Sequence, residues 1–156
     1  MSDTRKRYVT WTELFNRCRL LAEQIHENGE PVHLTAIARG GWVPARLIGG
    51  YLEAQGIRVS YSTIHVHSYD DSNQQKAVTI TEPQIYEPPH SEQWWLIDDL
   101  VDSGNTVEAL LTEIYRTPRL AVVFYKTESS VTPELYAEMT AADEWIVFPY
   151  ETEARE

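Results

Sequence analysis

The chain has 156 residues, 42% of them hydrophobic and 24% charged, which predicts a soluble protein with a single domain over residues 1–156. Its net charge of −11 disfavours nucleic acid and anionic membranes as partners, because both repel a negative surface. Its one cysteine, Cys18, is expected in the core. The sequence favours a cytoplasmic location, because it has a single cysteine, no signal segment and no run of roughly 18 apolar residues.

Three segments have the apolar spacing of amphipathic helices. The first begins at the capping-box sequence Thr10–Glu13, whose side chains can bond reciprocally to the backbone. The second has Pro44 in its first turn and Gly56 just after its end, which are the positions that these residues favour. The third covers residues 106–115.

Strand patterns lie between these helices. In chain order, the predicted strands cover residues 33–38, 58–67, 77–81, 94–97, 120–125 and 145–148. Residues 135–139 fit a strand or a helix, and the polar stretch 68–76 predicts a loop. The alternation predicts an α/β fold, with a parallel twisted sheet flanked by helices on both faces. Ligands bind beyond the carboxyl ends of such strands, where Arg39, residues 98–106 and Lys126 are expected.

The most informative segment covers residues 94–106, where a buried strand leads into two acids and a turn of small residues. The turn consists of Asp102, Ser103, Gly104, Asn105 and Thr106. Such a turn can aim backbone amides and hydroxyls at one anion, and the adjacent Asp98 and Asp99 can hold sugar hydroxyls or Mg²⁺. Alternatively, Asp102 only caps the helix and the other acids are solvated. Three acids at one helix start repel each other, which favours a site for a cation or a hydroxyl-rich ligand.

Residues 98–106 resemble the signature of the type I phosphoribosyltransferases, in which a strand runs into two acids and a phosphate-binding turn. The resemblance extends from Tyr8 to Pro149, and it is closest to bacterial xanthine–guanine and archaeal hypoxanthine phosphoribosyltransferases. It implies that family's fold, with a small hood formed by the terminal segments. It also implies purine salvage: Mg²⁺-dependent transfer of the 5-phosphoribosyl group from phosphoribosyl pyrophosphate (PRPP) to N9 of guanine, xanthine or hypoxanthine, with release of pyrophosphate.

The resemblance implies a role for each matching residue around PRPP. Asp98 and Asp99 would contact the ribose hydroxyls or the metal, and the turn would bind the 5-phosphate. Asp102 would also handle the proton at purine N7, and Arg39 would act with it in catalysis. The implied PRPP site comprises Arg39, Gly40, Gly41, Asp98, Asp99, Asp102, Ser103, Gly104, Asn105 and Thr106.

Two loops also resemble parts of that family. The sequence Arg39-Gly40-Gly41 resembles the pyrophosphate loop, in which glycines let the backbone approach an anion and the guanidinium supplies several donors. Ser68 and Tyr69 begin a segment that resembles the lid, which keeps water from the reacting centre. Taken alone, the first loop is a tight turn with a surface arginine and the second is a hydrophilic connector.

Three residues near the C-terminus correspond to base-binding positions. Lys126 would donate to O6 of the purine, Trp145 would stack on the base, and Ile146 would line the pocket. Taken alone, a lysine at a strand end is solvated and a tryptophan belongs to the core. Together they favour 6-oxopurines over adenine, because an ammonium pairs with a carbonyl and not with an amino group. Because relatives are dimers or tetramers, a homodimer or homotetramer is expected.

Two other functions stay open at this stage. A non-catalytic relative would keep the nucleotide cradle as a regulatory or binding protein, although it has no reason to retain every catalytic residue. A transferase for a different base, such as orotate or uracil, would share the same PRPP motif. Lys126 and the segment from Trp145 to Pro149 favour a purine.

Overall fold

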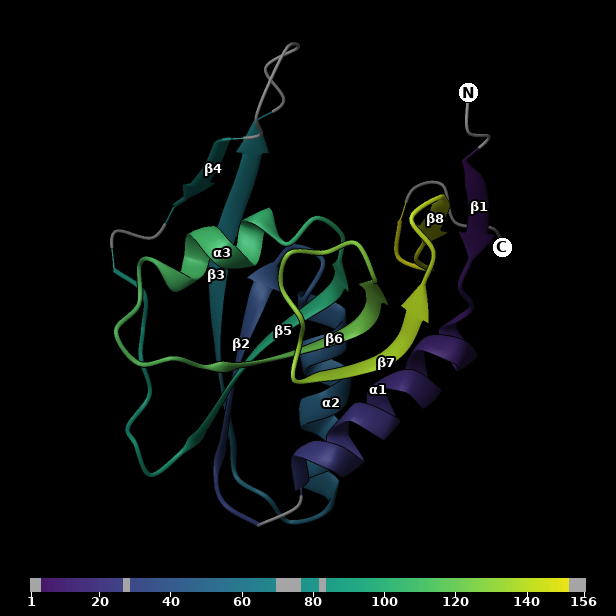
Figure 1. Cartoon of the computed structure of the whole chain (residues 1–156). Helices are drawn as coiled ribbons and strands as arrows, with labels where there is room; N and C mark the ends of the chain where they lie inside the picture. Colours follow the sequence, from purple (N-terminus) through teal and green to yellow (C-terminus); the bar gives the residue numbers. More distant parts are fainter. Residues whose placement is uncertain (1–3, 27–28, 70–76, 82–83, 152–156) are drawn as a thin grey trace.

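The computed structural model of the chain describes residues 4–26, 29–69, 77–81 and 84–151. Eight strands and three helices are found in this part of the chain (Figure 1). In order they are β1 (Arg5–Tyr8), α1 (Trp11–Ile25), β2 (Val32–Ala38), α2 (Trp42–Ala54), β3 (Val59–Tyr69), β4 (Ala77–Ile80), β5 (Gln93–Val101), α3 (Asn105–Leu111), β6 (Arg119–Lys126), β7 (Leu135–Thr140) and β8 (Glu144–Val147). The predicted α/β fold is confirmed.

The main sheet has six strands in the order β4-β3-β2-β5-β6-β7. All neighbouring strands run parallel except β3 and β4, which form an antiparallel pair. Helices α1 and α2 cover one face of the sheet and α3 lies on the other (Figure 1). Because β2 and β5 are central and adjacent, the loops that follow them meet at one edge of the sheet. That edge carries the predicted site.

A second, two-stranded sheet forms the expected hood. Strand β1 pairs in parallel with β8, so that Lys6 lies opposite Trp145 and Arg7 lies opposite Ile146. Figure 1 shows this pair beside β7. The pairing of terminal segments places Trp145 near the carboxyl edge of the main sheet.

The local signals for the first two helices are confirmed. Thr10 Oγ1 accepts from the Glu13 amide at 3.1 Å, and Glu13 Oε2 accepts from the Thr10 amide at 2.8 Å. Pro44 lies in the first turn of α2, and Gly56 adopts a φ of 82° just after the helix. Cys18 is buried in the core, and burial raises the pKa of its thiol to about 12. Such a thiol is not a nucleophile at neutral pH.

Several predictions of helices and strands are wrong or incomplete. Helix α3 ends at Leu111, four residues early, because Thr112 Oγ1 donates to the Ala109 carbonyl at 2.7 Å and competes with the helical bonding. Strand β5 does not stop before the acids but continues through them to Val101. The ambiguous segment near residue 135 is strand β7, and β1 was not predicted at all.

None of the helices in the described residues is long and apolar enough to cross a membrane.

Candidate active site

Three cavities adjoin at the carboxyl edge of the sheet, and we name them by position. The cradle cavity, of about 220 Å³, is lined by Asp98 and residues 102–107. The hood cavity, of about 670 Å³, is lined by Arg39, Gly40, Trp42, Val43, Asp99, Trp145, Tyr150 and Glu151. A bridging cavity of about 160 Å³ is lined by both acids together with Gly40 and Thr106. The loop 39–41, the turn 102–106 and the hood therefore surround one continuous region.

The phosphate-cradle turn connects β5 to α3. Gly104 has a φ of 90°, a left-handed conformation that glycine adopts without strain. A Cβ atom at this position would lie 2.6 Å from Ser130 Oγ, so the space behind the turn also requires glycine. The Ser130 amide holds the turn in place by donating to the Ser103 carbonyl at 2.9 Å. The first amides of α3 have no acceptor within the helix. The Asn105 amide donates instead to Ser103 Oγ at 3.3 Å, at the end of the helix that favours an anion.

The two acids of β5 both line the bridging cavity, and each also lines one of the cavities beside it. Asp98 lines the cradle cavity and Asp99 lines the hood cavity. Burial raises the pKa of both carboxyls, and the charge of Asp99 raises that of Asp98 further. Within the described residues, neither carboxylate forms an ion pair with Lys or Arg. A bound cation or hydroxyl-rich ligand would relieve this repulsion.

The loop between β2 and α2 packs directly against this acid pair. A Cβ atom at Gly40 would lie 2.6 Å from Asp99 Oδ1, and one at Gly41 would lie 2.2 Å from the Ile97 carbonyl oxygen. A side chain at Gly41 would overlap backbone atoms, so that position admits only glycine, whereas a side chain at Gly40 would have to displace the Asp99 carboxylate. The Ala38–Arg39 peptide bond is cis, and the exposed Arg39 side chain lines the hood cavity.

Lys126 connects the end of β6 to the cradle turn. Its side chain is only 9% exposed, and its Nζ lies 3.5 Å from Asp102 Oδ1. The same ammonium donates to the Ala142 carbonyl at 3.4 Å. The structure thus brings together the two residues that were predicted to handle the purine ring, although they are 24 positions apart in the sequence.

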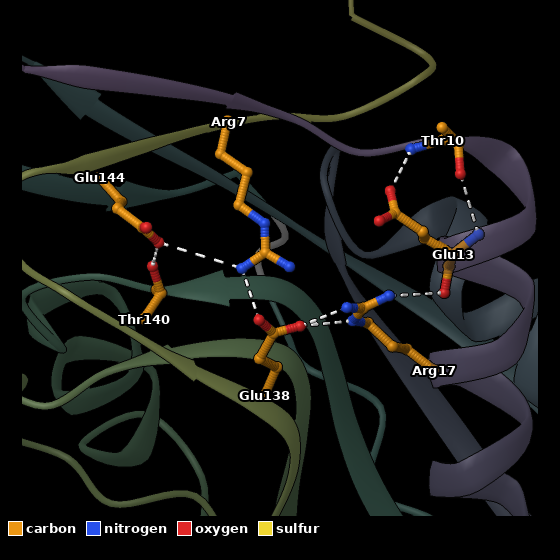
Figure 2. Close-up of polar contacts among 7 residues, drawn as sticks. All are labelled: Arg7, Thr10, Glu13, Arg17, Glu138, Thr140 and Glu144. Carbon is orange, nitrogen blue, oxygen red and sulfur yellow. Dashed lines mark hydrogen bonds and ion pairs between the residues drawn. The ribbon is translucent and has the colours of Figure 1, made fainter.

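The hood is fixed to the main sheet by a charge cluster beneath β1 (Figure 2). Glu138 of β7 accepts from Arg7 Nη1 at 2.5 Å and from Arg17 Nε of α1 at 2.7 Å. The hydrogen bond from Arg7 lowers the pKa of the Glu138 carboxyl. Both guanidinium groups also lie over the ring of Phe124, at 5.3 and 5.5 Å from its centroid. One carboxylate thereby joins β1, α1 and β7, and this fixes the strand that carries Trp145.

The remaining predicted residues are placed as follows. Trp145 is 53% exposed and lines the hood cavity, whereas the Ile146 side chain is buried in the main core. Any contact of Ile146 with a base would therefore come from its backbone. Ser68 and Tyr69, where the loop was predicted to begin, belong instead to β3, which continues two residues past its predicted end because they pair with Val78 and Ala77. The rest of the predicted lid, residues 70–76, lies outside the described residues.

Two residues of the site were missed in the sequence. Tyr150 follows the hood strand, and its hydroxyl donates to Asp99 Oδ2 at 2.7 Å. Trp42 opens α2 and lines the hood cavity beside Arg39. Neither stands in a recognisable motif; only the fold brings them to the acid pair. The single available signal was that Tyr150 directly follows the segment that resembles the family's base-binding tail.

Comparison with known proteins agrees with this geometry. The sequence profile of the phosphoribosyl transferase domain matches residues 5–156. The xanthine-guanine phosphoribosyltransferase of Gluconobacter oxydans is 32% identical over 92% of this chain and 83% of its own length. That of Desulfotalea psychrophila is 31% identical over 99% of this chain and 93% of its own length. The crystal structure of a purine phosphoribosyltransferase from Pyrococcus horikoshii superposes with a TM-score of 0.79, at 27% identity and 97% coverage of both chains.

Proposed function

The chain belongs to the phosphoribosyltransferase family, and from that premise we propose that it transfers the 5-phosphoribosyl group of PRPP to N9 of a 6-oxopurine. The observation that carries the proposal is the position of Lys126, whose ammonium lies 3.5 Å from Asp102 at the rim of the phosphate cradle. A purine ring held between that ammonium and the hood would present N9 towards the sugar. Relatives that are more than 30% identical are named for xanthine and guanine, which agrees with this placement.

Each part of PRPP has a matching part of the site. The turn 102–106 and the start of α3 offer amides and hydroxyls to the 5-phosphate. Asp98 and Asp99 face the position of the ribose, between the cradle and hood cavities. The loop of Arg39, Gly40 and Gly41 presents backbone and a guanidinium to the pyrophosphate.

The acid pair also fits Mg²⁺. Mg²⁺ binds proteins through one or two carboxylates and completes its shell with water and substrate phosphate oxygens. Asp98 and Asp99 supply two carboxylates that have no ion-pair partner within the described residues. In the same part of the chain, no group of three or more His, Cys, Asp or Glu side chains is arranged to hold a metal. Mg²⁺ would therefore enter with PRPP and neutralise the charge of the pyrophosphate.

In the proposed reaction, the bond between C1′ of the ribose and the pyrophosphate oxygen breaks, and a bond from purine N9 to C1′ forms. The sugar gains positive charge as the leaving group departs, and the nearby carboxylates of β5 stabilise that charge. Asp102 would accept the proton of N7 as N9 bonds to C1′, and its position beside the ammonium of Lys126, which would donate to O6, supports this role. The described residues contribute mainly positioning and fixed charge.

The test is a steady-state assay of the purified protein with PRPP, Mg²⁺ and a panel of bases. We expect turnover with guanine, xanthine or hypoxanthine and none with adenine, orotate or uracil. Turnover with orotate or uracil alone would identify a transferase for another base. Nucleotide binding without any turnover would identify a non-catalytic relative.

Two further expectations belong to this proposal. Assembly as a homodimer or homotetramer is to be measured by light scattering of the intact chain. A cytoplasmic location is to be tested by fractionation of the source cells.

A further inference from the structure

Tyr150 lies where the hood, the loop 39–41 and the acid pair meet. It comes two residues after Phe148, and the two rings are stacked with centroids 5.4 Å apart and an interplanar angle of 5°. Trp11 of α1 lies on another side, with its centroid at 6.3 Å. The ring is therefore held by aromatic contacts that a phenylalanine would also make.

The hydroxyl of Tyr150 makes a separate set of contacts. It donates to Asp99 Oδ2 at 2.7 Å, and it lies 3.4 Å from the carbonyl oxygen of Gly40. Both partners belong to the proposed PRPP site. A hydrogen bond to an ionised carboxylate is among the stronger ones in proteins, and it fixes which oxygen faces the ligand.

Within the described residues, the Asp99 carboxyl also has hydrogen bonds with the neighbouring Asp98 side chain and the Leu100 backbone, but both partners belong to the same strand, so Tyr150 is the contact that comes from the hood. The carboxylate packs on Gly40, where a Cβ would lie 2.6 Å from its oxygens, and no lysine or arginine of the described residues pairs with it. Without the phenol, the carboxylate would lose the contact that ties it to the hood, and it could turn more readily about its side-chain bonds towards the adjoining cavities.

We propose that Tyr150 is a positioning residue, whose hydroxyl fixes the Asp99 carboxylate for PRPP and its metal. This inference rests on the proposed function. The residue also forms part of the wall of the hood cavity, beside Trp145. It therefore connects the pocket proposed for the base to the carboxylate proposed for the sugar and pyrophosphate.

The test is Tyr150→Phe, which keeps the aromatic stack and removes only the hydroxyl. We expect the kcat/KM for PRPP to fall about tenfold, on the scale of one hydrogen bond to a charged group. The KM for guanine should change less than about twofold, because stacking contacts are retained. A merely structural role would lower thermal stability and affect both substrates alike.

The matched control is Tyr51→Phe. Tyr51 also donates from its hydroxyl to a carboxylate, Glu23 at 3.3 Å, but between α1 and α2 and remote from the cavities. This variant should have unchanged constants for both substrates. Equal kcat/KM values for PRPP in Tyr150→Phe and wild type would overturn the proposal, as would an equal loss for PRPP and guanine.

Calorimetry with PRPP and Mg²⁺ in the absence of a base separates this proposal from the proposed function. Wild-type protein that binds PRPP but transfers it to no purine would contradict the transfer reaction and leave the role of Tyr150 to be judged by affinity. We expect Tyr150→Phe to bind PRPP about tenfold more weakly than wild type. Equal affinities would contradict the positioning role even if the transfer reaction were confirmed.

Discussion

Replacing Lys126 with methionine tests the proposed choice of base. Methionine keeps an unbranched side chain of similar length and removes the ammonium. That ammonium is almost fully buried, with Asp102 Oδ1 at 3.5 Å and the Ala142 carbonyl at 3.4 Å. An ammonium has three N–H donors, so one remains for an acceptor on the purine.

The magnitude follows from that geometry. A hydrogen bond to a charged group contributes about 1.5–3 kcal/mol, which corresponds to roughly a 10- to 150-fold change in kcat/KM. Lys126→Met should therefore lower kcat/KM for guanine, xanthine and hypoxanthine by that factor. The preference over adenine should shrink by the same factor, because the ammonium gains nothing from an amino group.

Steady-state kinetics with each base at saturating PRPP provide the measurement. A titration of PRPP at saturating guanine should give a KM for PRPP within about twofold of wild type, because the proposed partner of Lys126 is the base. Arg19→Met is the matched control, since it removes an exposed cation from α1, where Arg19 pairs with Glu23 at 3.8 Å. If Lys126→Met and the control gave the same kcat/KM for guanine, the assignment of Lys126 to O6 would be refuted.

Four further predictions concern the site and the stability of the fold. Asp102→Asn should lower kcat by about 10²-fold or more, the scale of lost general acid–base catalysis, with little change in the affinity for the product nucleotide; a near-normal kcat would remove Asp102 from the mechanism. Chelation should abolish activity and added Mg²⁺ should restore it, whereas full turnover in excess chelator would exclude a role for the metal. Trp145→Ala should raise the KM for every purine by a similar factor, because stacking involves the face of the ring, which all purines share; a change for one purine only would contradict stacking. Burial lowers the pKa of His33 below its ordinary value of 6.5, against the weaker opposing effect of Glu92, so the unfolded chain binds more protons. The free energy of unfolding should then fall as the pH drops below about 6.5, and urea titrations of wild type and His33→Gln should show a steeper fall in wild type.

The segment 98–106 was predictive because its chemistry is local. A turn of small residues after a strand and two acids places donors and carboxylates within a few ångströms, whatever the rest of the chain does. The glycines of the loop 39–41 were also interpretable, since a Cβ atom at Gly41 would overlap backbone atoms and one at Gly40 would displace the Asp99 carboxylate. The roles assigned to these residues remain predictions until they are measured.

Features that depend on pairing between distant segments were not predictable. Strand β1 consists largely of Arg and Lys, and it forms only because β8 offers a partner edge. The bond between Tyr150 and Asp99 joins residues 51 positions apart, and no pattern around Tyr150 indicates it. The early end of α3 reflects the Thr112 hydroxyl, which donates a hydrogen bond to the Ala109 carbonyl and competes with the helical bonding. The spacing of apolar residues does not indicate that competition.

The most direct measurement is product analysis of the chain incubated with PRPP, guanine and Mg²⁺. The proposed reaction predicts guanosine 5′-monophosphate, linked through N9, and pyrophosphate in equal amounts, with neither formed when either substrate is omitted. Release of pyrophosphate together with free ribose 5-phosphate, or no product at all, would contradict the proposed transfer.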